Sequence, residues 1–225
     1  MEINNYGRQL SDGDINDDIH RDFVGGLWDV IGKLQFDFML SKGLRPDMRF
    51  LDVGCGALRG GINFIDYLNS GNYYGLDSNK SLLKAGYEKE LLQLGLQDKC
   101  PRSNLLDDQY FKFDRFVSEV DMALAISVFT HLPLNHIRLC FIELAKVMKP
   151  GGCFYATFFD VGNDHPMEEP KTHQPGGIVT HFTEDPYHYQ FEDIHLAARD
   201  LPWHVEYLGD WDHPRAQKMV CLTRG

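Results

Sequence analysis

Apolar positions along the chain fall into two patterns, short continuous runs and stripes that recur every three or four residues. The continuous runs predict buried strands of a parallel sheet, at 50–53, 121–127 and 153–159. The stripes predict amphipathic helices, at 23–44, 62–68, 78–96 and 133–148. Because these strands and helices alternate, the pattern predicts an α/β fold.

Three stretches fall outside this alternation. Residues 1–21 are polar and acidic without an apolar core, so we expect a flexible arm and no signal peptide. Residues around 160–189 carry prolines, glycines and four histidines, and a loop insert of this length is as a rule functional or mobile. The chain then ends with a predicted helix and two predicted strands, at 191–201, 204–208 and 216–223. We therefore expect a single domain over residues 22–225.

Composition and charge exclude several classes of protein. The 225 residues suffice for one domain with a full core, and the net charge of −11 argues against a large phosphate-binding surface. No apolar run approaches the ~20 residues that a membrane span needs. The five cysteines include no CxxC pair, which favours reduced thiols over disulfides or structural zinc. We expect a cytoplasmic protein whose partners are neither nucleic acid nor membrane.

Candidate chemistry begins where the first strand ends. Gly54 and Gly56 follow that strand and precede a helix, which is the first unit of a nucleotide-binding α/β sheet. Glycines let a ligand approach the backbone amides, and these amides favour an anionic or carboxylate group. About twenty residues on, a strand over 72–77 ends in Asp77, and an acid at this offset can accept hydrogen bonds from a ribose diol.

The segments Leu51–Gly56 and Gly75–Asp77 together resemble the class I S-adenosylmethionine-dependent methyltransferases. A dinucleotide-binding fingerprint would place glycine at position 59, which is Arg59 here. The methyltransferase pattern often has a third glycine at position 58, which is Leu58, so the detail of this turn stays open. The resemblance implies a Rossmann-like fold with a mostly parallel seven-stranded sheet, helices on both faces and an antiparallel final hairpin.

The resemblance also implies that S-adenosylmethionine binds at the C-terminal ends of the strands. Asp52 and the 54–56 backbone would hold its methionine part, and Asp77 its ribose. The complete predicted cofactor site consists of Asp52, Gly54, Cys55, Gly56, Arg59, Asp77, Ser78, Asn104, Leu105, Ser127 and Val128.

Some of these positions have alternative interpretations. Arg59 could pair with the cofactor carboxylate or make a surface contact. The family would place its third strand near 103–106, where Asn104 is either an adenine contact or a turn residue. An N-terminal helix can close over the cofactor in this family, which would turn Trp28 and Gln35 toward the pocket. The alternative is that both side chains only help to bury the apolar face of the predicted helix at 23–44.

His131 is the candidate catalytic residue. It follows the strand at 121–127, close to where the methyl group should sit, and a histidine can take the proton of an alcohol at neutral pH. The alternative is that His131 caps the next helix or fills a polar gap. Asp160, at the end of the following strand, could orient this base, bind substrate, ligate a metal or only form a turn.

The histidines at 165, 173, 181 and 188 lack the spacing of metal-ligand pairs. We therefore assign no metal residue and expect these side chains, with Tyr187 and Tyr189, to line a polar substrate mouth. A divalent metal stays open, held by Asp160 with Glu168 or Glu169, because some sugar methyltransferases require one.

Two features of the sequence bear on the acceptor class: a motif that is missing after the strand at 121–127, and a resemblance to a smaller group of enzymes. The strand at 121–127 is followed by Ser-Val-Phe-Thr and not by Asn-Pro-Pro-Tyr or Asn-Pro-Pro-Phe, which argues against methylation of nucleic-acid bases. Three short runs, Gly-Ala-Leu-Arg-Gly-Gly, Ser-Val-Phe-Thr-His-Leu and Gly-Asp-Trp-Asp-His-Pro-Arg, resemble a group of bacterial enzymes that includes sugar and polysaccharide O-methyltransferases. The hypothesis is O-methylation of a sugar or another hydroxylated small metabolite. Alternatives are N-, C- or carboxyl-methylation of a small molecule and a non-catalytic module that binds S-adenosylmethionine, and a homodimer stays open.

Overall fold

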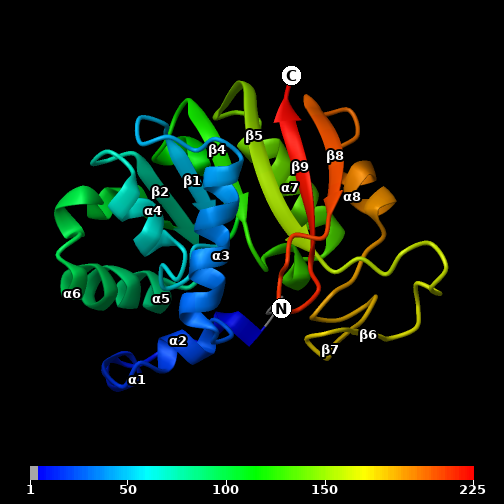
Figure 1. Cartoon of the computed structure of the whole chain (residues 1–225), viewed down its shortest axis with the longest axis horizontal. Helices are drawn as coiled ribbons and strands as arrows, with labels where there is room; N and C mark the ends of the chain where they lie inside the picture. Colours follow the sequence, from blue (N-terminus) through cyan, green and yellow to red (C-terminus); the bar gives the residue numbers. More distant parts are fainter. Residues whose placement is uncertain (1–4) are drawn as a thin grey trace.

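A seven-stranded sheet forms the centre of the computed structural model, which describes residues 5–225 (Figure 1). The strand order is β3-β2-β1-β4-β5-β9-β8. Five strands are parallel: β1 (Phe50–Val53), β2 (Tyr73–Asp77), β3 (Leu105–Asp107), β4 (Val120–Ala125) and β5 (Met148–Phe158). The last two pair antiparallel at one edge, β8 (Trp203–Gly209) and β9 (Lys218–Arg224). This sheet confirms the predicted fold class and its final hairpin.

Helices cover both faces of the sheet. One face carries α3 (Trp28–Ser41), α4 (Gly61–Tyr67) and a helical stretch made of α5 (Lys80–Ala85), a π-helical segment (Gly86–Leu91) and α6 (Leu92–Leu94). The other face carries α7 (Leu134–Leu144) and α8 (Phe191–Ala197). Short 3₁₀ turns complete the chain, at Asn5–Gly7, Gln97–Lys99, Arg102–Asn104, Phe113–Arg115 and Phe129–His131.

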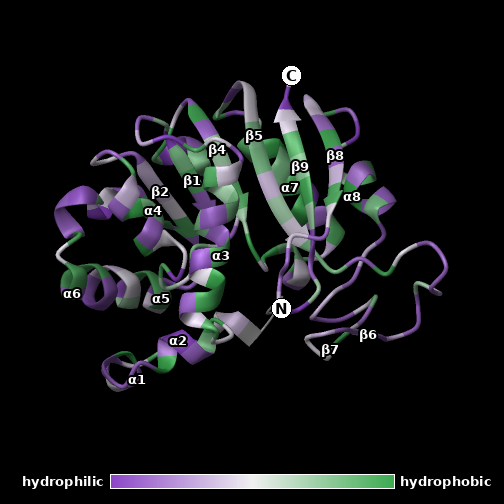
Figure 2. Cartoon of the chain, in the orientation of Figure 1, coloured by the Kyte–Doolittle hydropathy of each residue, from purple (hydrophilic) through white to green (hydrophobic). Residues whose placement is uncertain are grey.

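The core lies in two layers because successive residues of a strand point to opposite faces. In β1, Leu51 and Val53 belong to the cluster that includes α7 and α8, whereas Phe50 belongs to the cluster with α3 and α4. All four residues of β1 are buried, as the continuous apolar run predicted. Figure 2 shows hydrophobic residues concentrated on the central strands and hydrophilic residues in the outer loops.

Several predicted boundaries differ from the structure, among them those of the third and fifth strands. The third strand begins at Leu105 and not at residue 103, because Arg102–Asn104 forms a 3₁₀ turn before it. Residues 149–152, which separate the predicted helix at 133–148 from the predicted strand at 153–159, lie within β5 as an irregularity: Val120 pairs with Met148, whereas Met122 pairs with Cys153. The extra residues on β5 are accommodated as a bulge, and Gly151 there has a φ of +78°.

The N-terminal segment is packed and helical over its described residues, in contrast to the flexible arm expected over residues 1–21. It contains α1 (Asp12–Asn16) and α2 (Ile19–Phe23), and it buries Leu10, Ile15 and His20. Residues 1–4 of the expected arm lie outside the described residues. The apolar stripe was too short to predict this packing, because each helix has only five residues.

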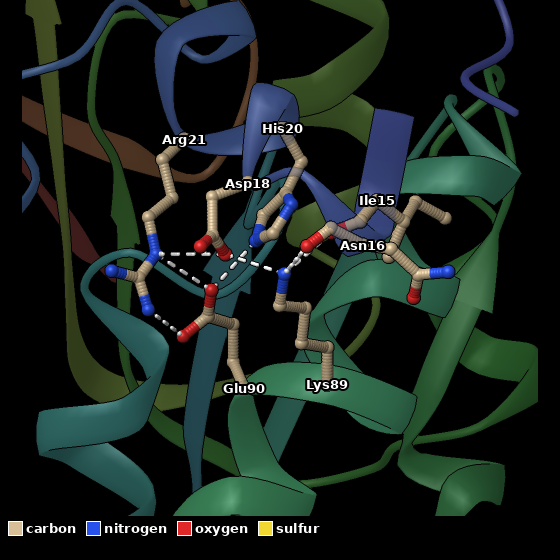
Figure 3. A network of polar contacts seen from close by, with 7 residues as sticks. All are labelled: Ile15, Asn16, Asp18, His20, Arg21, Lys89 and Glu90. Atoms are coloured by element: carbon tan, nitrogen blue, oxygen red, sulfur yellow. Dashed lines mark hydrogen bonds and ion pairs between the residues drawn. The ribbon is translucent and has the colours of Figure 1, made fainter. Parts of the chain in front are cut away.

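A polar network fixes this segment to the helical stretch after β2 (Figure 3). The buried Glu90 carboxylate accepts hydrogen bonds from Arg21 Nε and Nη2, both at 2.9 Å, and contacts His20 Nε2 at 2.6 Å. Lys89 Nζ lies 2.6 Å from Asp18 Oδ1 and donates to two backbone carbonyls at 2.7 Å, those of Ile15 and Asn16. These bonds hold the N-terminal segment beside the C-terminal edge of the sheet.

The insert between β5 and α8 contains a small hairpin, β6 (Lys171–His173) and β7 (Ile178–Thr180). Its buried histidines bond to one hydroxyl: His173 Nε2 and His188 Nδ1 lie 2.8 and 2.9 Å from Thr180 Oγ1. His188 Nε2 contacts the carbonyl oxygen of Met167 at 2.9 Å. The hydrogen bonds of these histidines therefore connect different parts of the insert to one another.

Candidate active site

A cavity of about 470 Å³ opens at the C-terminal ends of β1, β2 and β4. This is the edge where parallel α/β sheets bind ligands, and the volume suits a small-molecule site. Ten of the twelve predicted site residues line it: Asp52, Gly54, Cys55, Gly56, Arg59, Asp77, Ser78, Ser127, Val128 and His131.

The turn after β1 requires glycine at position 54. Gly54 has a φ of +71°, and a Cβ atom there would lie 2.4 Å from Val128 Cγ2. The backbone N–H groups of Gly54 and Cys55 both donate to the carbonyl oxygen of Leu76, at 2.7 and 3.1 Å. The turn is thus pressed against β2 on one side and against the loop after β4 on the other.

Leu58 adopts the backbone conformation that a glycine would prefer at this position. Its φ is +68°, and its side chain is fully buried. A Cβ atom at Gly86 would lie 2.7 Å from Leu58 Cγ, and one at Gly61 would lie 3.0 Å from Leu58 Cδ2. The leucine therefore occupies space that two other glycines leave open, which accounts for the departure from the family pattern.

Asp77 links the acid of β2 to this turn. Its Oδ2 accepts a hydrogen bond from the Gly56 N–H at 2.8 Å, and its Oδ1 accepts one from the Asn79 N–H at 2.7 Å. Burial raises the pKa of Asp77, and these backbone donors act against the rise. Asn79 in turn caps α5, because its side chain accepts from the N–H groups of Ser81 and Leu82.

Asp52 lies in the floor of the cavity and is buried. Tyr73 Oη donates to its Oδ2 at 2.8 Å. Burial raises the pKa of Asp52 to about 7, and the hydrogen bond from Tyr73 opposes this rise.

Arg59 brings an incompletely bonded guanidinium to the cavity wall. Its Nη1 donates to the carbonyl oxygens of Val24 and Gly26, at 2.9 and 3.0 Å, while its buried Nε has no hydrogen-bond partner among residues 5–225. Burial, together with the nearby Arg215, lowers the pKa of Arg59 to about 10. Gln35 of α3 also lines the cavity, whereas Trp28 is not among its lining residues.

His131 lies at the end of the 3₁₀ turn Phe129–His131 and also lines the cavity. Its Nδ1 contacts Oδ1 of Asp185, a residue of the insert. The ring of Tyr6 packs edge-on against the imidazole with centroids 4.6 Å apart. Nearby, Ser127 has a φ of +59°, and its N–H donates to Thr157 Oγ1 at 2.8 Å.

Asn104 and Leu105 do not line the cavity, in contrast to the prediction. Asn104 precedes β3, so it lies at the wrong end of that strand, where its Nδ2 donates to the carbonyl oxygens of Gly71 and Tyr73. Leu105 is part of the core. The residues that follow β3 line the cavity in their place: Asp108, Gln109 and Phe111.

Sequence reasoning also missed contributions from distant segments. Tyr6, Gly7 and Val24 of the N-terminal segment line the cavity, and Asp185 reaches His131 from the insert. The N-terminal residues carry no motif that would have identified them. None of the insert histidines at 165, 173, 181 and 188 is among the lining residues, since two of them are buried around Thr180.

The described residues offer little support for a metal at Asp160. One of its oxygens accepts from Tyr207 Oη at 2.7 Å and the other from the Gly162 N–H at 2.8 Å, so it forms a turn and a strand contact. Within residues 5–225, the one cluster with ligand-like spacing is Asp18, His20 and Glu90. Its carboxylates are already paired with Lys89 and Arg21.

Comparisons with known proteins agree with this geometry. A family model described as a methyltransferase domain matches residues 51–154, from β1 into β5. The cycloartenol-C-24-methyltransferase of Arabidopsis thaliana is 32% identical over 52% of this chain and 33% of its own length. The chain spans a third to a half of the length of the curated relatives that it matches.

Two solved structures share the fold over the whole chain. The CcbJ methyltransferase from Streptomyces caelestis superposes with a TM-score of 0.68 at 15% identity, covering 100% of both chains. The magnesium protoporphyrin IX methyltransferase from Synechocystis, with bound S-adenosylmethionine, has a TM-score of 0.60 at 14% identity and covers 100% of this chain and 88% of its own. At these identities the likeness concerns the fold.

Among the helices of residues 5–225, none combines the length and apolar character that crossing a membrane requires. The glycine turn, the acid of β2 and the matched domain fall on the same segment of one fold. Residues 51–154 thus match a methyltransferase domain, and the chain has the fold of solved S-adenosylmethionine-dependent methyltransferases.

Proposed function

We propose that this protein transfers the methyl group of S-adenosylmethionine to a hydroxyl oxygen of a small molecule, a sugar or another hydroxylated metabolite. The observation that carries this proposal is that the Gly54–Gly56 turn, Asp77 and His131 line the same cavity. A cofactor-binding turn and a proton acceptor at the walls of one cavity are what methylation of an alcohol requires.

The cofactor half of the cavity fits S-adenosylmethionine through groups of three kinds. The Asp77 carboxylate suits a ribose diol, and at Gly54 and Gly56 the turn after β1 lines the cavity with backbone that carries no side chain. The buried Arg59 Nε, which has no hydrogen-bond partner within the described part of the chain, suits a carboxylate of the methionyl part. When bound there, S-adenosylmethionine supplies an electrophilic methyl group.

In the part of the cavity that would hold the acceptor, His131 is assigned the role of general base. The enzyme's main task is to hold the acceptor oxygen and the methyl carbon in contact, since methyl transfer is an in-line displacement. A hydroxyl must also lose its proton, and the imidazole at the cavity wall can accept it.

Calorimetry with S-adenosylhomocysteine and a methyl-transfer assay with labelled S-adenosylmethionine test the proposal. The acceptor panel contains a monosaccharide, a catechol, a sterol and a matched carboxylic acid. We expect binding, turnover of a hydroxylated acceptor, and a loss of about 10²–10⁴ in rate for His131→Ala with cofactor affinity unchanged. Tight binding without turnover of any acceptor would favour a non-catalytic binding module.

The curated relatives favour a second candidate, carbon methylation of a sterol. The Arabidopsis relative is named for the C-24 position of cycloartenol. Turnover of the sterol alone, with His131→Ala as active as the unsubstituted protein, would support this candidate against the first. A homodimer, a divalent metal and a cytoplasmic location stay predictions.

A further inference from the structure

The insert delivers a carboxylate to the proposed catalytic histidine. Asp185 lies 54 positions after His131 in the sequence, yet its Oδ1 contacts the histidine Nδ1. The two side chains are 15% and 21% exposed, so the pair is largely removed from water. A hydrogen bond to a charged group is stronger in such surroundings than in bulk solvent.

Backbone bonds fix this part of the insert to the loop that carries His131. The Tyr187 N–H donates to the carbonyl oxygen of Thr130 at 2.7 Å, and Tyr189 Oη donates to that of Leu132 at 2.6 Å. These bonds are to the residues immediately before and after His131. The position of Asp185 relative to the imidazole is therefore set by the backbone on both sides of the histidine.

The rest of the insert supports the same loop. The His181 N–H donates to the carbonyl oxygen of Pro186 at 2.9 Å, and the His188 N–H donates to that of His181 at 3.1 Å. His188 is also bonded through its side chain to Thr180, which bonds in turn to His173, and all three side chains are fully or almost fully buried. The hairpin β6–β7 thus serves as a rigid base for the Asp185 loop.

A second segment holds the imidazole from a different direction. The Tyr6 ring packs edge-on against His131 and also against Phe23, with centroids 4.6 and 5.7 Å apart. The carbonyl oxygen of Tyr6 accepts a hydrogen bond from Asn79 Nδ2 at 2.7 Å, which anchors this segment beside the end of β2. The imidazole is therefore held by contacts from two parts of the chain that are far apart in sequence.

We propose that Asp185 is a positioning residue for His131, and that the insert is the element that makes this histidine a base. The carboxylate favours the tautomer in which Nδ1 carries the proton, so that the lone pair offered to the acceptor is that of Nε2. This inference rests on the proposed function. The acceptor hydroxyl gives its proton to Nε2 while its oxygen bonds to the methyl carbon, and the electrons of the breaking carbon–sulfur bond remain on sulfur.

The main kinetic test compares Asp185→Asn and Asp185→Glu with Glu184→Gln. Asparagine keeps the size of the side chain but removes its charge and can support the wrong tautomer. We expect Asp185→Asn to lower kcat by about 10²-fold, with KM and S-adenosylhomocysteine affinity within about twofold, and Asp185→Glu to recover part of the loss. Glu184 is the matched control, because it lies next to Asp185, its side chain is 72% exposed, and its carboxylate lies 3.7 Å from His181 Nδ1 and not against His131.

A double substitution separates positioning from a merely structural role. If Asp185 acts through His131, adding Asp185→Asn to His131→Ala should cause no further loss of kcat. A further loss of the same size as in the single variant would overturn the inference, and so would full activity of Asp185→Asn.

A readout without turnover keeps this inference distinct from the proposed function. Histidine-ring ¹⁵N spectra of the full chain, assigned by the signals that disappear in His131→Ala, report the tautomer directly. We expect a protonated Nδ1 in the unsubstituted protein and a changed pattern in Asp185→Asn. A protonated Nε2 with bare Nδ1 in the unsubstituted protein would overturn the inference even if Asp185→Asn does not fold.

Discussion

The Asp77 carboxylate accepts a hydrogen bond from the backbone N–H of Gly56, 21 positions earlier in the chain, at 2.8 Å. This bond joins the end of β2 to the turn after β1, the two features from which the cofactor site was predicted. The protein backbone therefore holds the carboxylate in place, and both residues line the cavity.

Substituting Asp77→Asn should weaken the binding of S-adenosylhomocysteine by about 10–100-fold, because a charged acceptor for the ribose diol is lost. The same loss is expected for 5′-methylthioadenosine, which keeps the ribose. Isothermal calorimetry measures both. Asp107→Asn is the matched control, since Asp107 pairs with Asp77 at the same end of the next strand and is exposed. Equal affinity in the two variants would contradict the assigned role.

Substituting Arg59→Gln should give a different ligand pattern. The loss of a charge-assisted hydrogen bond predicts about 10–100-fold weaker binding of S-adenosylhomocysteine. Binding of 5′-methylthioadenosine should stay unchanged, because this ligand has no carboxylate. The exposed Arg45 provides a control substitution, Arg45→Gln. If both ligands lose affinity equally, Arg59 serves only to hold the Val24 and Gly26 carbonyls.

Substituting Gly54→Ala should destabilise the protein by about 2 kcal/mol or more, because a left-handed backbone penalises any Cβ atom and this one would collide with Val128. Urea unfolding measures the change. Val128→Ala added to Gly54→Ala should restore only part of the stability, since it removes the collision and leaves the φ of +71°. Gly54→Ala with unaltered stability would show that the turn can adopt another conformation.

Stability should fall as the pH is lowered from about 7 toward 4, partly through His173. Burial lowers the pKa of His173 to about 4, whereas a histidine in the unfolded chain titrates near 6.5. Between these values the unfolded state binds a proton that the folded state does not, so stability decreases with falling pH. The full shift corresponds to about 3 kcal/mol.

The measurement compares urea unfolding at pH 7.5 and 4.5 for the unsubstituted protein, His173→Gln and His195→Gln. The pH dependence should be smaller only in His173→Gln, because His195 is exposed. Asp52, whose raised pKa of about 7 acts in the opposite direction, is common to all three proteins and cancels in the comparison. An identical pH dependence in all three would contradict the prediction.

Patterns over a few neighbouring residues were enough to predict those elements whose structure depends on these residues alone. The apolar runs identified β1 and β4 because a central parallel strand is buried on both faces, and the glycine turn was found because its backbone excludes side chains. β3 was placed two residues early, since its three residues are too few to show a period. As a result, the predicted cofactor positions Asn104 and Leu105 lie before and at the start of the strand, whereas Asp108, Gln109 and Phe111, which follow it, line the cavity.

The sequence by itself determined the α/β fold, the cofactor edge of the sheet and His131 as the candidate base, because strand burial, turn geometry and side-chain type follow from neighbouring residues. Only the tertiary structure decided what surrounds that histidine. Tyr6 and Asp185 reach it from segments that are 125 and 54 positions away along the chain, held there by contacts to α5 and to the loop after β4. Such long-range contacts depend on how whole elements pack, and no local spacing of residues records them.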